Sequence, residues 1–343
     1  MTTDQINYLN IGLMILSAGL AFMLPFELFL FSYTVLGPLH YLTEINWLHK
    51  RKYFTNSPND YLVLLGLCAA FFVLYVVFLF GHNEAYITFL DRTTGLSIAG
   101  WGDWIQPWTV HLVFVAFASS LIMVVVQNVR LKIILIALST VVAMAFQEVD
   151  AYIILVGVFL PTIVHVLIFT GIFILFGALK GKSRTGYLSF GIYLICAASF
   201  FLIGFENAGY TVSDEVWANY TETKIHFLNL SLVQAIAPLH SDQQTFKKLG
   251  VMVAQLVAFA YTYHYLNWFS KTSIIKWHQI SKAKLAATIG IWLLSVGIYL
   301  YNYKVGVVVL IFLSTLHVFY EFPLNYRSVF GVAEELKLRL RGA

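Results

Sequence analysis

Charged side chains are scarce in this sequence. Only 11% of its 343 residues are Asp, Glu, Lys or Arg, whereas 59% are hydrophobic, and the mean hydropathy is +0.78. Soluble domains carry about 25% charged residues, so a chain this poor in charge cannot cover itself with a polar surface. The composition therefore excludes an ordinary soluble protein and predicts an integral membrane protein whose surface largely faces lipid.

Cysteine and nucleotide-binding motifs are also lacking. The two cysteines, Cys68 and Cys196, lie in apolar runs and form no CxxC pair, which excludes a disulfide framework. The sequence has no P-loop and no GxGxxG fingerprint, so we expect no ATP-driven work by this chain alone. It has no basic run interleaved with aromatic residues, so we expect no nucleic-acid partner.

Long apolar runs fill most of the chain. A membrane-spanning helix needs about 20 mostly apolar residues, and these runs are too long for the strands of a barrel. The sequence therefore predicts an all-α polytopic bundle of about ten transmembrane helices, in one membrane domain covering residues 1–343. The expected spans are 6–24, 27–48, 60–80, 108–128, 132–150, 152–178, 186–205, 248–270, 284–302 and 305–322.

The distribution of Lys and Arg predicts the orientation. With the N-terminus inside, 16 of the 21 Lys and Arg residues fall in cytoplasmic segments and 5 fall outside, as the positive-inside rule requires. We therefore expect both termini on the cytoplasmic side of the cell (inner) membrane. Two long outer loops follow at 81–107 and 206–247, and the second holds a semi-apolar stretch, 225–239, that is a candidate interfacial helix.

Three histidines lie inside expected spans at a similar depth. His40, His264 and His317 each fall near the inner end of a span that runs from outside to inside. Ionisable side chains are costly within a membrane and usually serve a function there. Three imidazoles from three helices at one level therefore indicate a metal site, and His165 after Pro161 is a candidate fourth ligand.

Two carboxylates share helix faces with these histidines. Glu44 lies four residues after His40, and Glu321 lies four residues after His317, a spacing that places both groups on one face. Each carboxylate either binds the metal or orients the imidazole. Imidazole with carboxylate suits Fe(II) and leaves positions open for oxygen, so Glu44, Glu321 and the neighbouring Tyr265 are candidate catalytic residues.

The order of motifs resembles a known family. A histidine-bearing aromatic turn, Ala260–His264, precedes a basic loop, one further span, and a Leu316-His317 step before Arg327. Near the N-terminus stands Pro38-Leu39-His40-Tyr41-Leu42-Thr43-Glu44. This arrangement resembles the Brp/Blh family of membrane β-carotene 15,15′-dioxygenases, mainly in the C-terminal third of the chain.

The resemblance implies an iron-dependent oxygenase that cleaves a polyene such as β-carotene to retinal. On that basis His40, His264 and His317 would be the iron ligands, and the substrate would be an apolar small molecule that enters from the lipid bilayer. The chain departs from the family pattern in several ways. It has more spans, and the family's second histidine-bearing motif has no clear match in it. Leu39 separates Pro38 from His40, and Trp268 stands where the family has the second histidine of a His-x-x-x-His motif.

Two other functions fit the same residues. A proton-coupled transporter would use buried His and Glu side chains as a relay, and it predicts broken helices in an inverted repeat. A structural or assembly membrane protein would use the outer loops as its contact surface and tolerate substitution of the histidines. The sequence identifies no protein partner for any of the three functions.

Overall fold

A computed structural model of the chain describes residues 1–81, 84–95, 101–203, 211–222, 226–237, 242–271, 276 and 279–341. Within these ranges the regular elements are helices and none is a strand, so the prediction of an all-α fold is confirmed. The chain forms two compact units. The first comprises Met1–Trp47, Thr162–Leu310 and Arg327–Ala343, and the second comprises Leu48–Pro161 and Ile311–Tyr326. The expectation of a single membrane domain stays a prediction.

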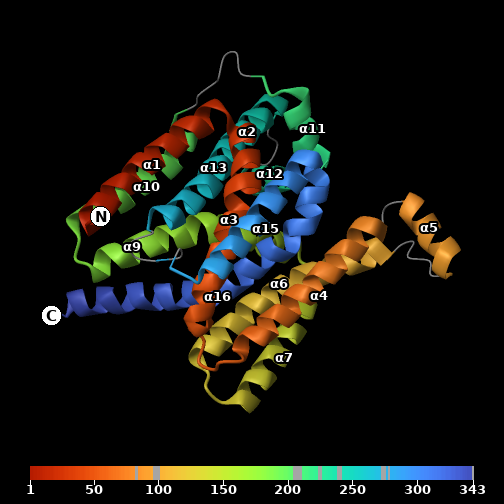
Figure 1. The fold of residues 1–343 in the computed structure, drawn as a ribbon, viewed down its shortest axis with the longest axis horizontal. Coiled ribbons are helices and arrows are strands. Elements are labelled where there is room, and N and C mark those ends of the chain that lie inside the picture. The colour runs from red at the N-terminus through yellow and green to blue at the C-terminus, as the bar shows by residue number, and fades with distance from the viewer. Residues whose placement is uncertain are drawn as a thin grey trace. The chain divides into compact units, whose positions relative to one another are not determined.

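The first unit is a helical bundle built around one long helix. Its elements are α1 (Thr3–Met23), α2 (Pro25–Phe31), η1 (Ser32–Leu36), α3 (Gly37–Lys50), α9 (Thr170–Lys180), α10 (Arg184–Leu202), α11 (Asp214–Glu222), α12 (His226–Ile236), α13 (Gln243–Ser270) and α15 (Lys282–Tyr301). Helices α1, α2, α10 and α12 pack against α13 (Figure 1). The apolar window of α13 is 67% buried, compared with 33% in α1 and 28% in α10. A helix buried on nearly all sides is a core element, so α13 determines where its neighbours lie.

Two π-helical stretches interrupt the α-helices, and each lies close to a histidine. His40 follows the first stretch by four residues, and His165 lies within the second. The stretch η1 joins α2 to α3, so the helical path is continuous from Pro25 to Lys50. The stretch η3 (Leu155–Phe169) contains Pro161, which has no N–H to donate to the helical ladder. Such turns are frequent at functional sites, because they change the spacing of side chains along a helix.

The second unit is organised by three neighbouring helices. Helix α6 (Trp101–Val125) packs against both α4 (Asp60–Gly81) and α7 (Val129–Ala145) (Figure 1). Val110, Val115, Ala143 and Tyr152 form a buried apolar cluster between these elements. The other elements of the unit are η2 (Lys52–Phe54), α5 (Glu84–Thr94), α8 (Asp150–Ile154), the first part of η3 and the middle of α16 (Tyr303–Leu340).

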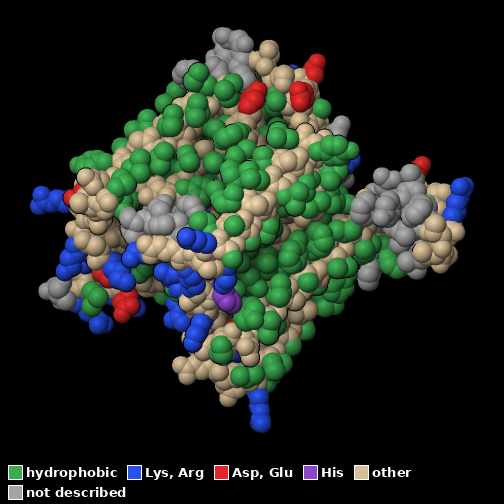
Figure 2. Space-filling view, in the orientation of Figure 1, with side chains coloured by type: hydrophobic (Ala, Val, Ile, Leu, Met, Phe, Trp, Pro, Cys, Tyr) green, Lys and Arg blue, Asp and Glu red, His purple; other side chains and the backbone are tan. Residues whose placement is uncertain are grey.

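Eight helices among the described residues are long and apolar enough to cross a membrane. They are Thr3–Met23, Asp60–Leu79, Pro107–Val125, Asp150–Lys180, Arg184–Leu202, Gln243–Ser270, Lys282–Tyr301 and Tyr303–Leu340. Hydrophobic side chains cover most of the visible helical surface in Figure 2, as lipid-facing helices require. Two expected spans are not among the eight. Span 27–48 lies in the continuous helix Pro25–Lys50, whose polar side chains lower its hydropathy, and span 132–150 is α7, which has 17 residues.

The two expected outer loops contain helices of their own. Residues 81–107 include α5 and the first turns of α6, and residues 206–247 include α11 and α12. The helix expected within 225–239 is confirmed as α12. Residues 82–83, 96–100, 204–210, 223–225 and 238–241 of these loops lie outside the described residues.

A buried ion pair joins α7 to the start of α4. The Lys132 ammonium lies 2.7 and 3.0 Å from the two carboxylate oxygens of Asp60, and it donates a third hydrogen bond to Ser57 Oγ at 2.9 Å. Lys132 is 4% exposed and Asp60 is 8% exposed. Removing one partner of such a pair leaves an uncompensated charge in a poorly solvated place.

We predict that Lys132→Met lowers the free energy of unfolding by roughly 3–5 kcal/mol, because Asp60 loses its counter-ion. Chemical unfolding in detergent micelles measures the change. Arg130→Met is the matched control, since Arg130 is exposed near the same end of α7. The double variant Lys132→Met/Asp60→Leu should recover most of the loss. Equal destabilisation by Lys132→Met and Arg130→Met would contradict the prediction.

Candidate metal centre

The site begins with two side chains on α3. His40 Nε2 lies 3.0 Å from Glu44 Oε2, one helical turn later, and the two residues are 1% and 2% exposed. The i,i+4 spacing predicted this shared face, and the structure shows the two groups in direct contact. The contact fixes one side of the His40 ring and places a carboxylate oxygen beside its Nε2 atom.

Helix α13 brings a second imidazole to the same point. His264 Nε2 lies 3.1 Å from His40 Nε2, although 224 residues separate the two in the sequence. The other ring nitrogen, Nδ1, lies 2.9 Å from Thr170 Oγ1 on α9. The Nε2 atom of His40 therefore has a second imidazole nitrogen and a carboxylate oxygen close to it, and Thr170 holds the far side of the His264 ring.

A third imidazole lies next to His264. His165, within η3, is 1% exposed, and its ring centroid is 5.2 Å from that of His264. A ring nitrogen of His165 lies within 4.8 Å of a ring nitrogen of His264. The sequence predicted His165 as a candidate fourth ligand, and the structure brings its ring within reach of His264.

The atomic spacing fits ligands of one metal ion. Two ligand atoms that lie roughly 2.1 Å from a metal, at an angle of roughly 90–110°, are about 3.0–3.4 Å apart. The Nε2–Nε2 and Nε2–Oε2 distances of 3.1 and 3.0 Å match this range. A buried carboxylate beside two imidazoles needs a cation or a proton to be stable, and a divalent metal supplies the charge directly.

The same distances also fit a hydrogen-bonded chain. Thr170 Oγ1 lies 2.9 Å from His264 Nδ1, and His264 Nε2 lies 3.1 Å from His40 Nε2. Glu44 Oε2 faces the same His40 Nε2 atom at 3.0 Å, so His40 can bond to only one of these two partners at a time. The tautomer of each ring decides which nitrogen donates. The arrangement can therefore either hold a metal or relay a proton, and only the metal requires several ligand atoms to converge on one point.

Aromatic side chains enclose His40. The ring centroids of Tyr265 and Trp268 lie 5.0 and 5.5 Å from that of His40. The Tyr265 hydroxyl is 2.7 Å from the Tyr41 hydroxyl, and Trp268 Nε1 donates to Thr43 Oγ1 at 2.9 Å. Tyr265, predicted as a candidate catalytic residue, is thus close to the imidazole, and its hydroxyl is engaged with Tyr41.

His317 and Glu321 belong to the second unit. Both lie on α16, four residues apart, and both are buried, at 3% and 1% exposure. Their ligand atoms lie within 4.8 Å of each other, as their spacing predicted. Their participation in the site around His40 and His264 stays a prediction.

Sequence reasoning missed Thr170 as part of this site. A threonine in an apolar helix has no distinctive pattern, because its hydroxyl usually bonds to its own backbone. The nearest available signal was His165, five residues earlier in the same helical path. The contact depends on how α9 and α13 pack in the folded chain, which the local sequence around Thr170 does not indicate.

Comparisons with known proteins give no further guide to this site: no family model, no curated protein and no solved structure matches the chain.

We predict that Thr170→Val weakens metal binding by about 10–100-fold, because it removes the hydroxyl that fixes the tautomer and orientation of His264. Competition with a chelating dye measures the affinity. Thr262→Val is the matched control, since the buried Thr262 hydroxyl bonds to Ser32 Oγ at 2.7 Å. Equal effects of the two substitutions would show that Thr170 has no specific role.

Proposed function

We propose that this chain is a membrane-embedded, iron-dependent oxygenase that acts on an apolar polyene or a lipid-like molecule such as a carotenoid. The observation that carries the proposal is the position of His40 Nε2, which lies 3.1 Å from His264 Nε2 and 3.0 Å from Glu44 Oε2. Imidazole and carboxylate ligands suit a ferrous ion, and the resemblance of the motifs to the Brp/Blh family supports the choice of iron over other divalent metals.

Each residue has a defined part in the proposed centre. His40, His264 and His165 supply ring nitrogens, and His317 supplies a further ligand as the sequence predicts. Glu44 either binds the metal or accepts a hydrogen bond from His40, and Glu321 has the same role toward His317. Thr170 positions His264 through Nδ1. When bound, a ferrous ion would bind and activate dioxygen.

The surroundings of the site favour an apolar substrate. Four aromatic rings, those of Tyr41, Tyr265, Trp268 and Phe269, have their centroids between 5.0 and 6.4 Å from that of His40. These rings exclude water and offer flat apolar surfaces to a polyene. We propose that such a substrate enters laterally from the bilayer, since the molecules that suit these walls are dissolved in lipid.

The metal content of the purified protein tests the proposal. We expect about one iron per chain in the wild type and a loss of that iron in His40→Ala/His264→Ala, because two convergent ligands are gone. Single His165→Ala and His317→Ala variants test the remaining ligands. His111→Ala is the control, because His111 is equally buried but bonds to Tyr152 in the second unit.

The two possible results separate the proposed functions. Iron lost with the ligands, together with oxygen-dependent cleavage of β-carotene, would establish the oxygenase. Metal-free wild-type protein that converts no polyene would refute it and favour the hydrogen-bonded chain from Glu44 to Thr170 as a proton relay. That outcome leads to proton-coupled uptake in proteoliposomes as the next measurement.

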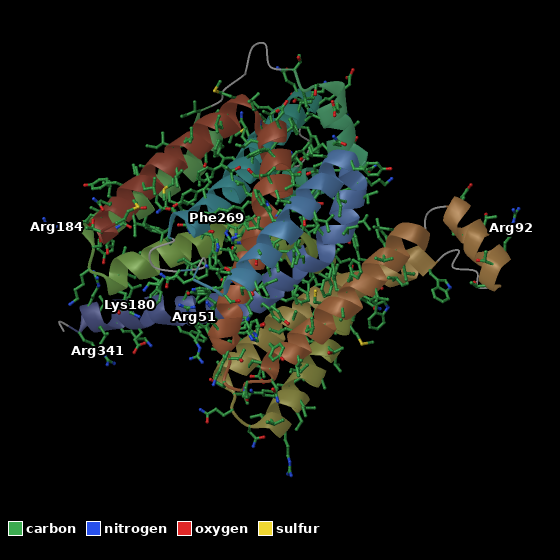
Figure 3. The ribbon with its side chains drawn as sticks, viewed as in Figure 1. Arg51, Arg92, Lys180, Arg184, Phe269 and Arg341 are labelled. Atoms are coloured by element: carbon green, nitrogen blue, oxygen red, sulfur yellow. The ribbon has the colours of Figure 1, made fainter. Side chains whose placement is uncertain are left out.

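We also propose ten membrane spans with both termini in the cytoplasm of the cell. The continuous helix Pro25–Lys50 and the apolar helix α7 would supply the two spans beyond the eight longer candidates. Lys180, Arg184 and Arg341 are labelled at one end of the first unit in Figure 3. The positive-inside rule places that end in the cytoplasm.

Labelling of introduced cysteines tests the orientation. The two native cysteines are free and buried, so Cys68→Ala/Cys196→Ala provides a background without reactive thiols. In intact cells, a membrane-impermeant maleimide should label Lys304→Cys directly and Lys182→Cys only after permeabilisation. Both positions are exposed. The opposite labelling pattern would show that the chain is inserted in the opposite orientation, which would contradict the proposal.

A further inference from the structure

A separate pocket lies at one end of the first unit, where four helices end or begin. It has a volume of about 230 Å³ and lies between the first turns of α1, the end of α9, the start of α10 and the end of α13. Ligand pockets commonly measure about 300–1,000 Å³. This smaller pocket therefore suits one end of a molecule, such as a head group, with the remainder outside.

Lys271 is the one charged residue among the described residues that line this pocket. It follows the last turn of α13 and is partly buried. No described carboxylate forms an ion pair with it. Burial lowers the pKa of its ammonium group to about 8, so the group is still mostly charged at neutral pH. A partly desolvated cation of this kind attracts an anion.

Amide side chains surround the pocket near this charge. Asn10 Oδ1 accepts hydrogen bonds from the hydroxyls of Tyr263 and Ser270, at 3.1 and 3.0 Å. Asn267, one turn before Lys271, also lines the pocket and is 7% exposed. Asn7 donates to Thr185 Oγ1 at 2.8 Å. The polar wall is therefore held in place by its own hydrogen bonds before any ligand arrives.

The pocket also has an apolar wall. Ile6, Phe173, Ile174 and Ala178 contribute aliphatic and aromatic surface. Lys and Arg side chains gather around this end of the first unit in Figure 2, where Figure 3 labels Lys180 and Arg184. A cluster of basic residues raises the local concentration of anions and of anionic lipids.

We propose that this pocket binds the anionic head of a single-chain or two-chain amphiphile, a carboxylate or a phosphate, with Lys271 as its counter-ion. The apolar wall holds the first carbons of the tail, and the rest of the tail lies in the bilayer. The proposal does not depend on the metal centre, because none of the predicted metal ligands lines the pocket.

Titration of the purified protein with three amphiphiles tests the proposal. The probes are oleate, oleoyl lysophosphatidate and neutral monooleoylglycerol, in a non-ionic detergent, with binding measured by native mass spectrometry. We expect the anionic probes to bind and the neutral one to bind weakly. Tighter binding of oleate would identify a fatty acid as the source, whereas tighter binding of lysophosphatidate would identify a phospholipid.

Lys271→Gln should weaken binding of the anionic probes by about 10–100-fold, because it removes the charged partner. Lys276→Gln is the matched control, since Lys276 is an exposed lysine that does not line the pocket. Equal binding of the neutral and anionic probes, or equal loss in the two variants, would overturn the proposal.

Gly177→Leu provides a second variant that leaves every charge in place. Gly177 lines the pocket, and a Cβ at this position meets no atom within 4 Å, so the backbone leaves room for a side chain here. We expect it to reduce binding at least as strongly as Lys271→Gln. Gly191→Leu on α10 is its control, because that position is equally open and lies outside the pocket. Unchanged binding in Gly177→Leu would also overturn the proposal.

Discussion

In the apolar interior of the first unit, His40 Nε2 lies 3.1 Å from His264 Nε2 and 3.0 Å from Glu44 Oε2. Polar groups in such a place must be satisfied, since lipid offers no hydrogen bonds. The requirement fixes how the continuous helix Pro25–Lys50 and α13 lie against each other. Ser32 bonds to Thr262, Tyr41 to Tyr265, His40 to His264 and Trp268 to Thr43. A shift of either helix by one residue would break this whole series, so the contacts define one register.

The sequence predicted the features of this arrangement that follow from the period of an α-helix and from the polarity of its residues. The i,i+4 spacing placed His40 and Glu44 on one face, and the low charge content identified a helical membrane protein. The similar depth of His40 and His264 led to the expectation that they meet. These inferences succeeded because each depends on helix geometry or on the cost of burying a polar group, both of which act locally.

Features that depend on packing between distant segments could not be predicted in this way. Thr170 beside His264, and Lys132 beside Asp60, involve residues that are ordinary in their local sequence. Lys132 was counted only as a positive charge at an inner loop, whereas in the structure it is buried in an ion pair. The π-helical stretches η1 and η3 were also missed, since apolar runs of this kind predict continuous α-helix.

The sequence of α13 explains how one helix can serve two different sites. Successive residues on an α-helix point about 100° apart. His264 and Trp268 therefore share the face that contacts His40 and Thr43. Tyr263, Asn267 and Lys271 repeat the same four-residue spacing one position earlier, and they line the pocket beside α1. The helix is buried on nearly all sides because both faces are occupied, which is why a single core helix can hold a candidate metal ligand and a candidate anion site within two turns.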